Sequence, residues 1–194
     1  MSEAVIKDGT GKGFSASVNS NNRLRTHAET LELLPAVSLR DGKAFMYKTD
    51  FVALTTTGSF SGLVYIQNSS TTPLAVMAIR TCGTAYCQWR ILKNPTGGTL
   101  ISGGTASTPL AMNFTSAEDF EGTALVGADT NTVTGATVLG TWINGGPGHS
   151  VEEFSGALIL GQGDSVALEV QPSAAATVCS TIQLAYVNAT ELGA

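Results

Sequence analysis

The stretch Gly156–Val187, GALILGQGDSVALEVQPSAAATVCSTIQLAYV, decides the fold class. In its middle run, Val166, Leu168 and Val170 fall on one face and the residues between them on the other. This period of two is typical of a half-buried β-strand. Pro172 ends the run because proline has no N–H to give to a β-ladder. We therefore predict that the chain closes with a three-stranded antiparallel meander.

Similar apolar runs, separated by turn residues, extend back to Lys43. They predict about nine or ten strands in all, at the spacing expected of a sandwich. The predicted strands before the meander cover residues 43–49, 51–57, 62–68, 74–81, 86–93, 99–101 and 109–114, with a longer pair within 130–143.

The composition also favours an all-β protein. The chain has 194 residues, of which 43% are hydrophobic, 13% are charged and 22 are glycine. Many short strands with Gly- and Pro-rich turns are typical of sandwiches and barrels. No apolar run approaches the ~20 residues of a membrane span, and the N-terminus lacks the pattern of a secretory signal. We expect neither a membrane partner nor a signal peptide.

The first 42 residues differ from the rest, because they are polar and rich in turn residues. Such a segment buries too little apolar surface to order itself alone. We predict an extended N-terminal arm (1–42) followed by a β-sandwich domain (43–194). As arm contacts to a partner we predict three apolar anchors with a charged rim, which are Phe14, Val18, Leu24, Arg23 and Arg25. The alternative is a tail without a partner.

Charge is unevenly spread along the chain. The formal net charge is −5; the first 43 residues carry +1 and the remainder −6. A nucleic-acid surface needs clustered Lys and Arg, so the acidic body argues against a nucleic-acid partner.

Three cysteines, Cys82, Cys87 and Cys179, are present. An odd count without a secretory signal fits a reducing compartment, and free cysteine packs as a small hydrophobe. We expect buried free thiols. A bridge between Cys82 and Cys87, across a plausible hairpin turn, is the alternative.

No motif for catalysis, metal or cofactor emerges. Glu152 and Glu153 are adjacent, so on a strand they point to opposite faces and do not form the paired carboxylates of a glycosidase. The spacing of the cysteines and of His149, which we expect in an exposed loop, matches no zinc motif. We expect no enzyme, no cofactor and no metal site.

Four aromatic residues raise the question of carbohydrate binding. They are Trp89, Trp142, Tyr65 and Tyr86. Aromatic residues of sandwich strands are more often core, which is the interpretation we adopt.

Several stretches resemble a group of tailed-bacteriophage virion structural proteins. The opening DGTGKGFSASVNSNNRLR (8–25) is similar to their N-terminal segment, in which Asp-Gly-x-Gly leads into Val-Asn…Asn-Arg-Leu. The 62–81 stretch, the turn NPTGG (94–98) and the closing GDSVALEVQP (163–172) are similar as well, whereas residues 115–155 match no pattern of the group.

This resemblance implies an antiparallel jelly-roll-like sandwich on a phage particle. It further implies a capsid decoration (cement) protein that binds the major capsid protein on the outer capsid surface and forms a homotrimer. The protein would be assembled in the host cytoplasm and located on the virion. A head-fibre or tail-associated module that binds a receptor or glycan is the alternative, and it predicts exposed aromatic residues around 130–150.

Overall fold

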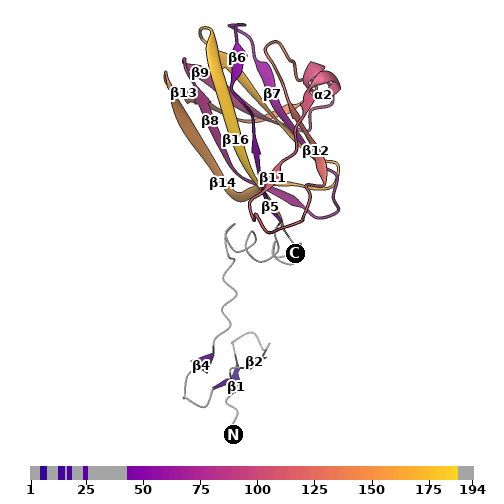
Figure 1. Cartoon of the computed structure of the whole chain (residues 1–194). Helices are drawn as coiled ribbons and strands as arrows, with labels where there is room; N and C mark the ends of the chain where they lie inside the picture. Colours follow the sequence, from indigo (N-terminus) through magenta and orange to yellow (C-terminus); the bar gives the residue numbers. More distant parts are fainter. Residues whose placement is uncertain (1–4, 8–12, 16, 19–23, 26–42, 188–194) are drawn as a thin grey trace. The chain divides into compact units, whose positions relative to one another are not determined.

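The computed structural model describes residues 5–7, 13–15, 17–18, 24–25 and 43–187 (Figure 1). The chain divides into two units, Met1–Glu32 and Leu33–Ala194, which are described separately. In the first unit, β1 (Val5–Lys7) pairs with β2 (Gly13–Ser15), and β3 (Ser17–Val18) pairs with β4 (Leu24–Arg25). Most of residues 1–42 lies outside the described residues, so the extended arm stays a prediction.

The described part of the second unit, residues 43–187, is an antiparallel β-sandwich of two packed sheets with one short helix (Figure 1). Its elements are β5 (Ala44–Lys48), β6 (Val52–Leu54), β7 (Ser61–Asn68), β8 (Leu74–Gly83), β9 (Cys87–Lys93), α2 (Thr99–Gly103), β10 (Thr105–Ala106), β11 (Leu110–Ala111), β12 (Gly122–Val126), β13 (Thr137–Asn144), β14 (Gly148–Leu160), β15 (Ser165–Pro172) and β16 (Ala176–Tyr186). Nine of these described strands have five or more residues, in agreement with the nine or ten predicted.

The strand order is that of a jelly roll. One sheet has the order β11-β5-β16-β8-β14 and the other β10-β12-β7-β15-β9-β13, while β6 extends the first sheet by pairing with β16. Leaving out the short or added strands β6, β10, β11 and β12, the eight that remain form two four-stranded sheets, β5-β16-β8-β14 and β7-β15-β9-β13. This is the double Greek-key arrangement of a jelly roll. The sequence patterns predicted only the all-β class, whereas the resemblance implied a jelly-roll-like sandwich, and this fold class is confirmed.

The predicted closing meander is wrong in its pairing. Residues 148–186 do form three consecutive strands, but β14 and β16 lie in one sheet on either side of β8, and β15 lies in the other between β7 and β9. The reason lies in burial. Strand β15 is buried on both faces, since Ala167 and Glu169 are covered as well as Val166 and Leu168. It takes a central position in a sheet covered on both sides, where its neighbours are the earlier strands β7 and β9.

Two other predicted elements differ. Residues 99–101, predicted as a strand, begin helix α2. The N–H of Leu100 donates to the carbonyl of Thr132 at 3.1 Å, and Leu100 is fully buried on the outer face of the β7 sheet. Gly98 precedes the helix with φ of +111°, and a Cβ there would collide with Thr132. Within 130–143 the structure has only β13 instead of a pair.

The main core fills the space between the two sheets. It is built on fully buried large side chains, including Trp89, Tyr47, Phe45 and Ile182. A smaller cluster of Tyr65, Leu92, Leu100 and Ala167 lies on the outer face of the β7 sheet under α2. Sheet and helix therefore cover both faces of β7, β9 and β15, so almost every residue of β7 and β15 is buried.

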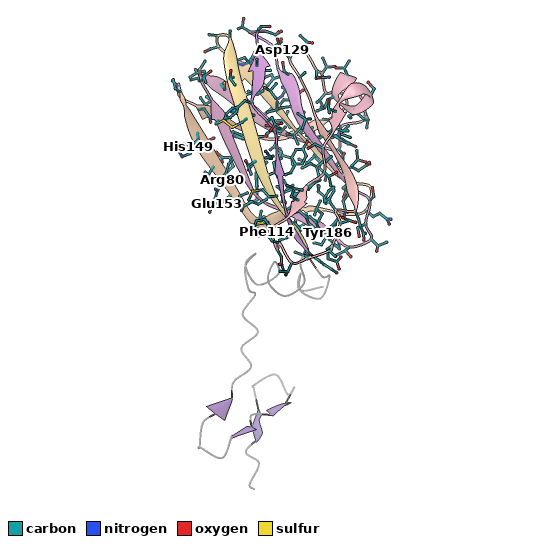
Figure 2. All side chains as sticks on the ribbon, in the orientation of Figure 1. Arg80, Phe114, Asp129, His149, Glu153 and Tyr186 are labelled. Carbon is teal, nitrogen blue, oxygen red and sulfur yellow. A yellow bond between two sulfur atoms is a disulfide. The ribbon has the colours of Figure 1, made fainter. Side chains whose placement is uncertain are left out.

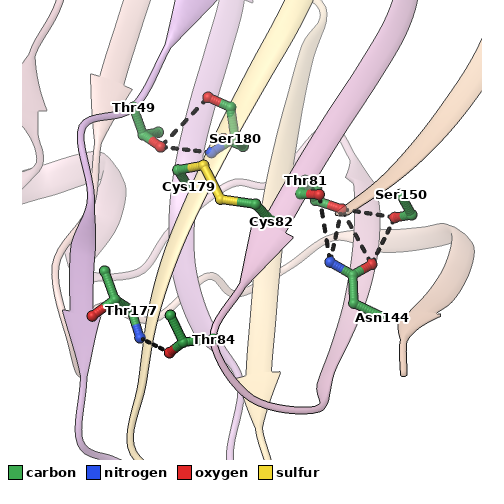
Figure 3. The surroundings of a disulfide bond; sticks show 9 residues. All are labelled: Thr49, Thr81, Cys82, Thr84, Asn144, Ser150, Thr177, Cys179 and Ser180. Atoms are coloured by element: carbon green, nitrogen blue, oxygen red, sulfur yellow. Dashed lines mark hydrogen bonds between the residues drawn. A yellow bond between two sulfur atoms is a disulfide. The ribbon is translucent and has the colours of Figure 1, made fainter. Parts of the chain in front are cut away.

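The cysteine prediction is wrong for two of the three thiols. Cys82 on β8 and Cys179 on β16 are directly opposite in register and form a disulfide, whereas Cys87 is free and buried (Figure 3). The partners are 97 residues apart, and only the strand order brings them together. The prediction of three free thiols and the alternative of a Cys82–Cys87 bridge were both made without knowledge of the strand order.

Hydrogen bonds between polar side chains link neighbouring strands near this disulfide (Figure 3). The Ser150 hydroxyl donates to Asn144 Oδ1 at 2.7 Å and lies 2.9 Å from the Thr81 hydroxyl, which accepts from Trp142 Nε1 at 3.2 Å. Thr81 and Asn144 are buried. Buried, satisfied networks of this kind rigidify their surroundings. This one joins β8, β13 and β14, which come from both sheets.

A charged pair lies on the outer face of the β7 sheet. Glu169 on β15 is 2% exposed and accepts from Arg90 Nε on β9 at 2.5 Å. The Arg90 guanidinium lies 3.8 Å from the centre of the Phe60 ring. Because buried carboxylates need compensation, Arg90 allows Glu169 to occupy this covered position.

The disulfide predicts the thiol count of the unfolded chain. In guanidinium without reductant, one thiol per chain, Cys87, should react with Ellman's reagent, and three should react after reduction. Reduction should lower the free energy of unfolding by about 2–4 kcal/mol, because the bond closes a long loop. Three reactive thiols before reduction, in protein purified under oxidising conditions, would contradict the pairing.

The variant Arg90→Leu should lower the free energy of unfolding by about 2–4 kcal/mol, because it leaves the Glu169 carboxylate buried without its cation. The matched control is Lys48→Leu, which removes the exposed Lys48–Asp50 pair, with side chains 67% and 94% exposed. It should change stability by less than about 0.5 kcal/mol. Equal effects in urea unfolding would show that burial of Glu169 does not govern the pair.

Candidate partner-binding site

The predicted arm contacts fall on two separate hairpins. Phe14 lies on β2, where its register partner is Ile6 on β1. Val18 on β3 and Leu24 on β4 are register partners, and Arg25 follows on β4. The structure therefore brings Val18 and Leu24 together but does not pair either with Phe14. Arg23 lies outside the described residues.

The sandwich begins and ends at one of its two ends. Ala44 at the start of β5 is the register partner of Ala185 near the end of β16, and the Tyr186 N–H donates to the Lys43 carbonyl at 3.0 Å (Figure 1). We call this end, with the loop of residues 112–121 beside it, the base. Residues that precede Lys43 join the sandwich at the base.

The base displays two apolar side chains. Phe114 is 100% exposed and Leu110 is 65% exposed. Phe114 is held out by a turn in which Asn113 Oδ1 accepts from both the N–H and the hydroxyl of Thr115, at 3.0 and 2.8 Å. Figure 2 labels Phe114 and Tyr186, both at this end of the sandwich. The sequence analysis missed this feature, because it extended the strand through Phe114, although Asn-x-Thr is a turn signal.

An acidic loop next to Phe114 is anchored by aromatic residues. Phe120 is buried and packs against the rings of Phe45 and Tyr186 at centroid distances of 5.8 and 6.2 Å. The Tyr186 hydroxyl donates to the Glu121 carbonyl at 2.8 Å and accepts from the Glu121 N–H at 3.0 Å.

This anchoring fixes a shallow hollow whose rim carries three exposed carboxylates beside Lys43. Its lining residues are Lys43, Phe45, Ser70, Thr72, Glu118, Asp119, Glu121 and Tyr186. The base is therefore an acidic surface with two protruding hydrophobic groups.

The predicted aromatic core holds for three of the four residues. Trp89 and Tyr65 are buried and Trp142 packs partly against the core, but Tyr86 is 45% exposed. Tyr86 lies in the β8–β9 connection, where strands no longer cover it. Within 130–150, the exposed large hydrophobic residues of the described chain are aliphatic.

The residues considered for chemistry do not converge. Glu152 and Glu153 are successive residues of β14, as predicted. His149 is exposed but lies on β14, opposite Cys82, instead of in a loop. Among the described residues, no three His, Cys, Asp or Glu side chains are placed to hold a metal ion, and no helix is long and apolar enough to cross a membrane.

No known protein family matches the chain, and comparison with curated proteins finds no relative.

Alkaline pH should destabilise the sandwich through Tyr186. Burial raises the pKa of Tyr186 from 10.0 to about 12. Between pH 10 and 12 the unfolded chain loses this proton while the folded chain keeps it, so the free energy of unfolding falls as pH rises. Burial raises the pKa of Tyr47 as well, which adds to the slope. Denaturant unfolding at several pH values measures this slope.

The variant Tyr186→Phe keeps the ring and removes the titrating hydroxyl. It should be less stable at neutral pH, because it loses the hydrogen bonds to Glu121, by about 1 kcal/mol. Its stability should fall less steeply above pH 10 than that of the wild type. An unchanged slope would assign the alkaline transition to other groups.

Proposed function

We propose that the chain is a structural protein of a tailed-bacteriophage virion, a decoration (cement) protein that binds the outer capsid surface and stabilises the shell. Its partners would be the major capsid protein and further copies of itself in a homotrimer. Two observations support the proposal. The opening and closing sequence motifs resemble such proteins, and the sandwich has the jelly-roll order that the resemblance implies.

The observation that carries the proposal is the layout of the base. The N-terminal arm would join the sandwich at the end that displays Phe114 and Leu110. An arm and an apolar patch that start from the same end can engage one surface together. The three carboxylates beside Phe114 favour a partner surface that is basic around an apolar pocket.

The mechanism would be added contact area between capsid subunits. An arm that orders on docking loses conformational entropy, but it can reach across a joint that a compact domain cannot span. Stable interfaces bury roughly 1,200–2,000 Å². In a trimer three arms act together, so modest individual contacts sum to strong attachment.

Binding of the purified chain to expanded capsids that lack it tests the proposal. The full-length chain should bind saturably and raise the temperature at which the capsids break open. Deletion of residues 1–42 should abolish binding. Replacement of both Val18 and Leu24 by Asp should weaken binding at least tenfold, because charged anchors cannot be buried without a large cost.

Variants of the base distinguish the contribution of the sandwich to capsid binding from that of the arm. Phe114→Asp should weaken capsid binding severalfold. Phe51→Asp, a change at another exposed aromatic residue (77% exposed) beyond the far end of β5, should not. If the full-length chain does not bind capsids at all, the decoration role falls, and binding to host cells becomes the function to test.

A further inference from the structure

The two sides of the sandwich are protected very differently. On one side the edge strands are β10 and β11, with two residues each. On the other side the edge strands are β13, with 8 residues, and β14, with 13. Within the described chain, each of these long strands has a hydrogen-bonded neighbour on one flank only. Proteins usually keep exposed edges short or charged, because an open edge pairs with other chains.

Both long edges carry exposed apolar side chains. Of the nine exposed large hydrophobic residues in the described chain, five lie on these two strands, which are Val138, Leu139, Ile143, Val151 and Ile159. We call them the β13–β14 strip. Strand β13, TVLGTWIN, contains no charged residue and no proline. The strip has two parts, because Val138 and Ile143 lie on the outer face of the β7 sheet and Val151 and Ile159 on the outer face of the β5 sheet. Exposed apolar side chains along open edge strands mark contact surfaces.

The strands that carry the strip are fixed by packing and hydrogen bonds on their inner side. Trp142, Phe154 and Leu158 pack partly against the main core. Asn144 at the end of β13 and Ser150 near the start of β14 share the buried hydrogen-bond network with Thr81 (Figure 3). The two edge strands, although they belong to different sheets, are thereby fixed relative to each other. Such a preorganised surface loses little side-chain entropy on binding.

We propose that the β13–β14 strip binds a second copy of this chain. This contact would hold the proposed homotrimer together. Only its assignment to the homotrimer rests on the proposed function. Two properties favour a copy over another partner. The open β13 edge of one copy can pair with the open β14 edge of the next, which is the head-to-tail contact that closes a ring, and the charges beside the strip complement each other.

The charges lie on the β14 half. Arg80 on β8 is exposed and opposite Val151, and Glu153 is exposed two residues further along β14 (Figure 2). Among the described residues neither has an ion-pair partner within 4.0 Å. The part of the chain after residue 43 carries −6, and opposite charges at the contact would offset the repulsion between two copies. Arg80 of one copy facing Glu153 of the next would supply them.

Sedimentation equilibrium and hydrogen exchange of the full-length chain, without capsids, test the inference. The wild type should be oligomeric, with protection from exchange at those β13 amides that are not bonded to β9. The double variant Val138→Lys, Ile143→Lys should weaken self-association at least 100-fold and expose those amides. The milder pair Val138→Ser, Ile143→Ser should weaken it at least tenfold and guards against misfolding, which circular dichroism would reveal.

The matched control is the pair Phe51→Lys, Leu110→Lys, at positions 77% and 65% exposed outside the strip, which should leave the association unchanged. A monomeric wild type overturns the inference; protected β13 amides in that monomer would mean that another part of the chain covers the strip. An oligomer that survives all strip variants also overturns it. If the chain is monomeric but binds capsids, the self-contact is overturned and the decoration role stands. If the chain is oligomeric but does not bind capsids, the decoration role is overturned and the self-contact stands.

Discussion

The pairing of β16 with β8 is the interaction on which the sandwich depends. Nine register pairs join the two strands, and the Cys82–Cys179 bond lies among them. Strand β16 also pairs with β5 and β6, and β8 also pairs with β14. The last long strand therefore completes a sheet in which its register partners lie up to 141 residues earlier in the chain, as for Ala185 and Ala44 (185 − 44). Contacts of such high sequence separation carry a large loop-closure cost, and burial of the sheet face that packs on the other sheet offsets it.

The strand order also explains why the possible contact surfaces lie where they do. A jelly roll places the start of β5 beside the end of β16, so the chain enters and leaves at the base. The same order puts β13 and β14, which follow each other in the chain, at the open edges of different sheets. In the proposed virion role, the base would face the capsid and the β13–β14 strip would face a neighbouring copy.

Local chemistry made some features predictable. The strands at 43–93 follow alternating or apolar runs bounded by turn residues, and their predicted ranges lie within a few residues of those found. The adjacency of Glu152 and Glu153 excluded a shared substrate position, and it needed only the period of a strand. By contrast, Phe114, Leu110 and the β13–β14 strip did not stand out in the sequence. An exposed apolar residue and a buried one have the same side chain, and only the neighbouring strands distinguish them.

The sequence by itself determined that this chain is an all-β sandwich whose strands begin near residue 43, because hydrophobic period and turn chemistry act over a few residues. Only the tertiary structure decided which strands are neighbours. The apparent closing meander was divided between two sheets, since β15 needed cover on both faces. The strand order also pairs Cys82 with Cys179 instead of Cys87, and Glu169 with Arg90. Each of these partners is about 80 or more residues away, where no local pattern can specify pairing.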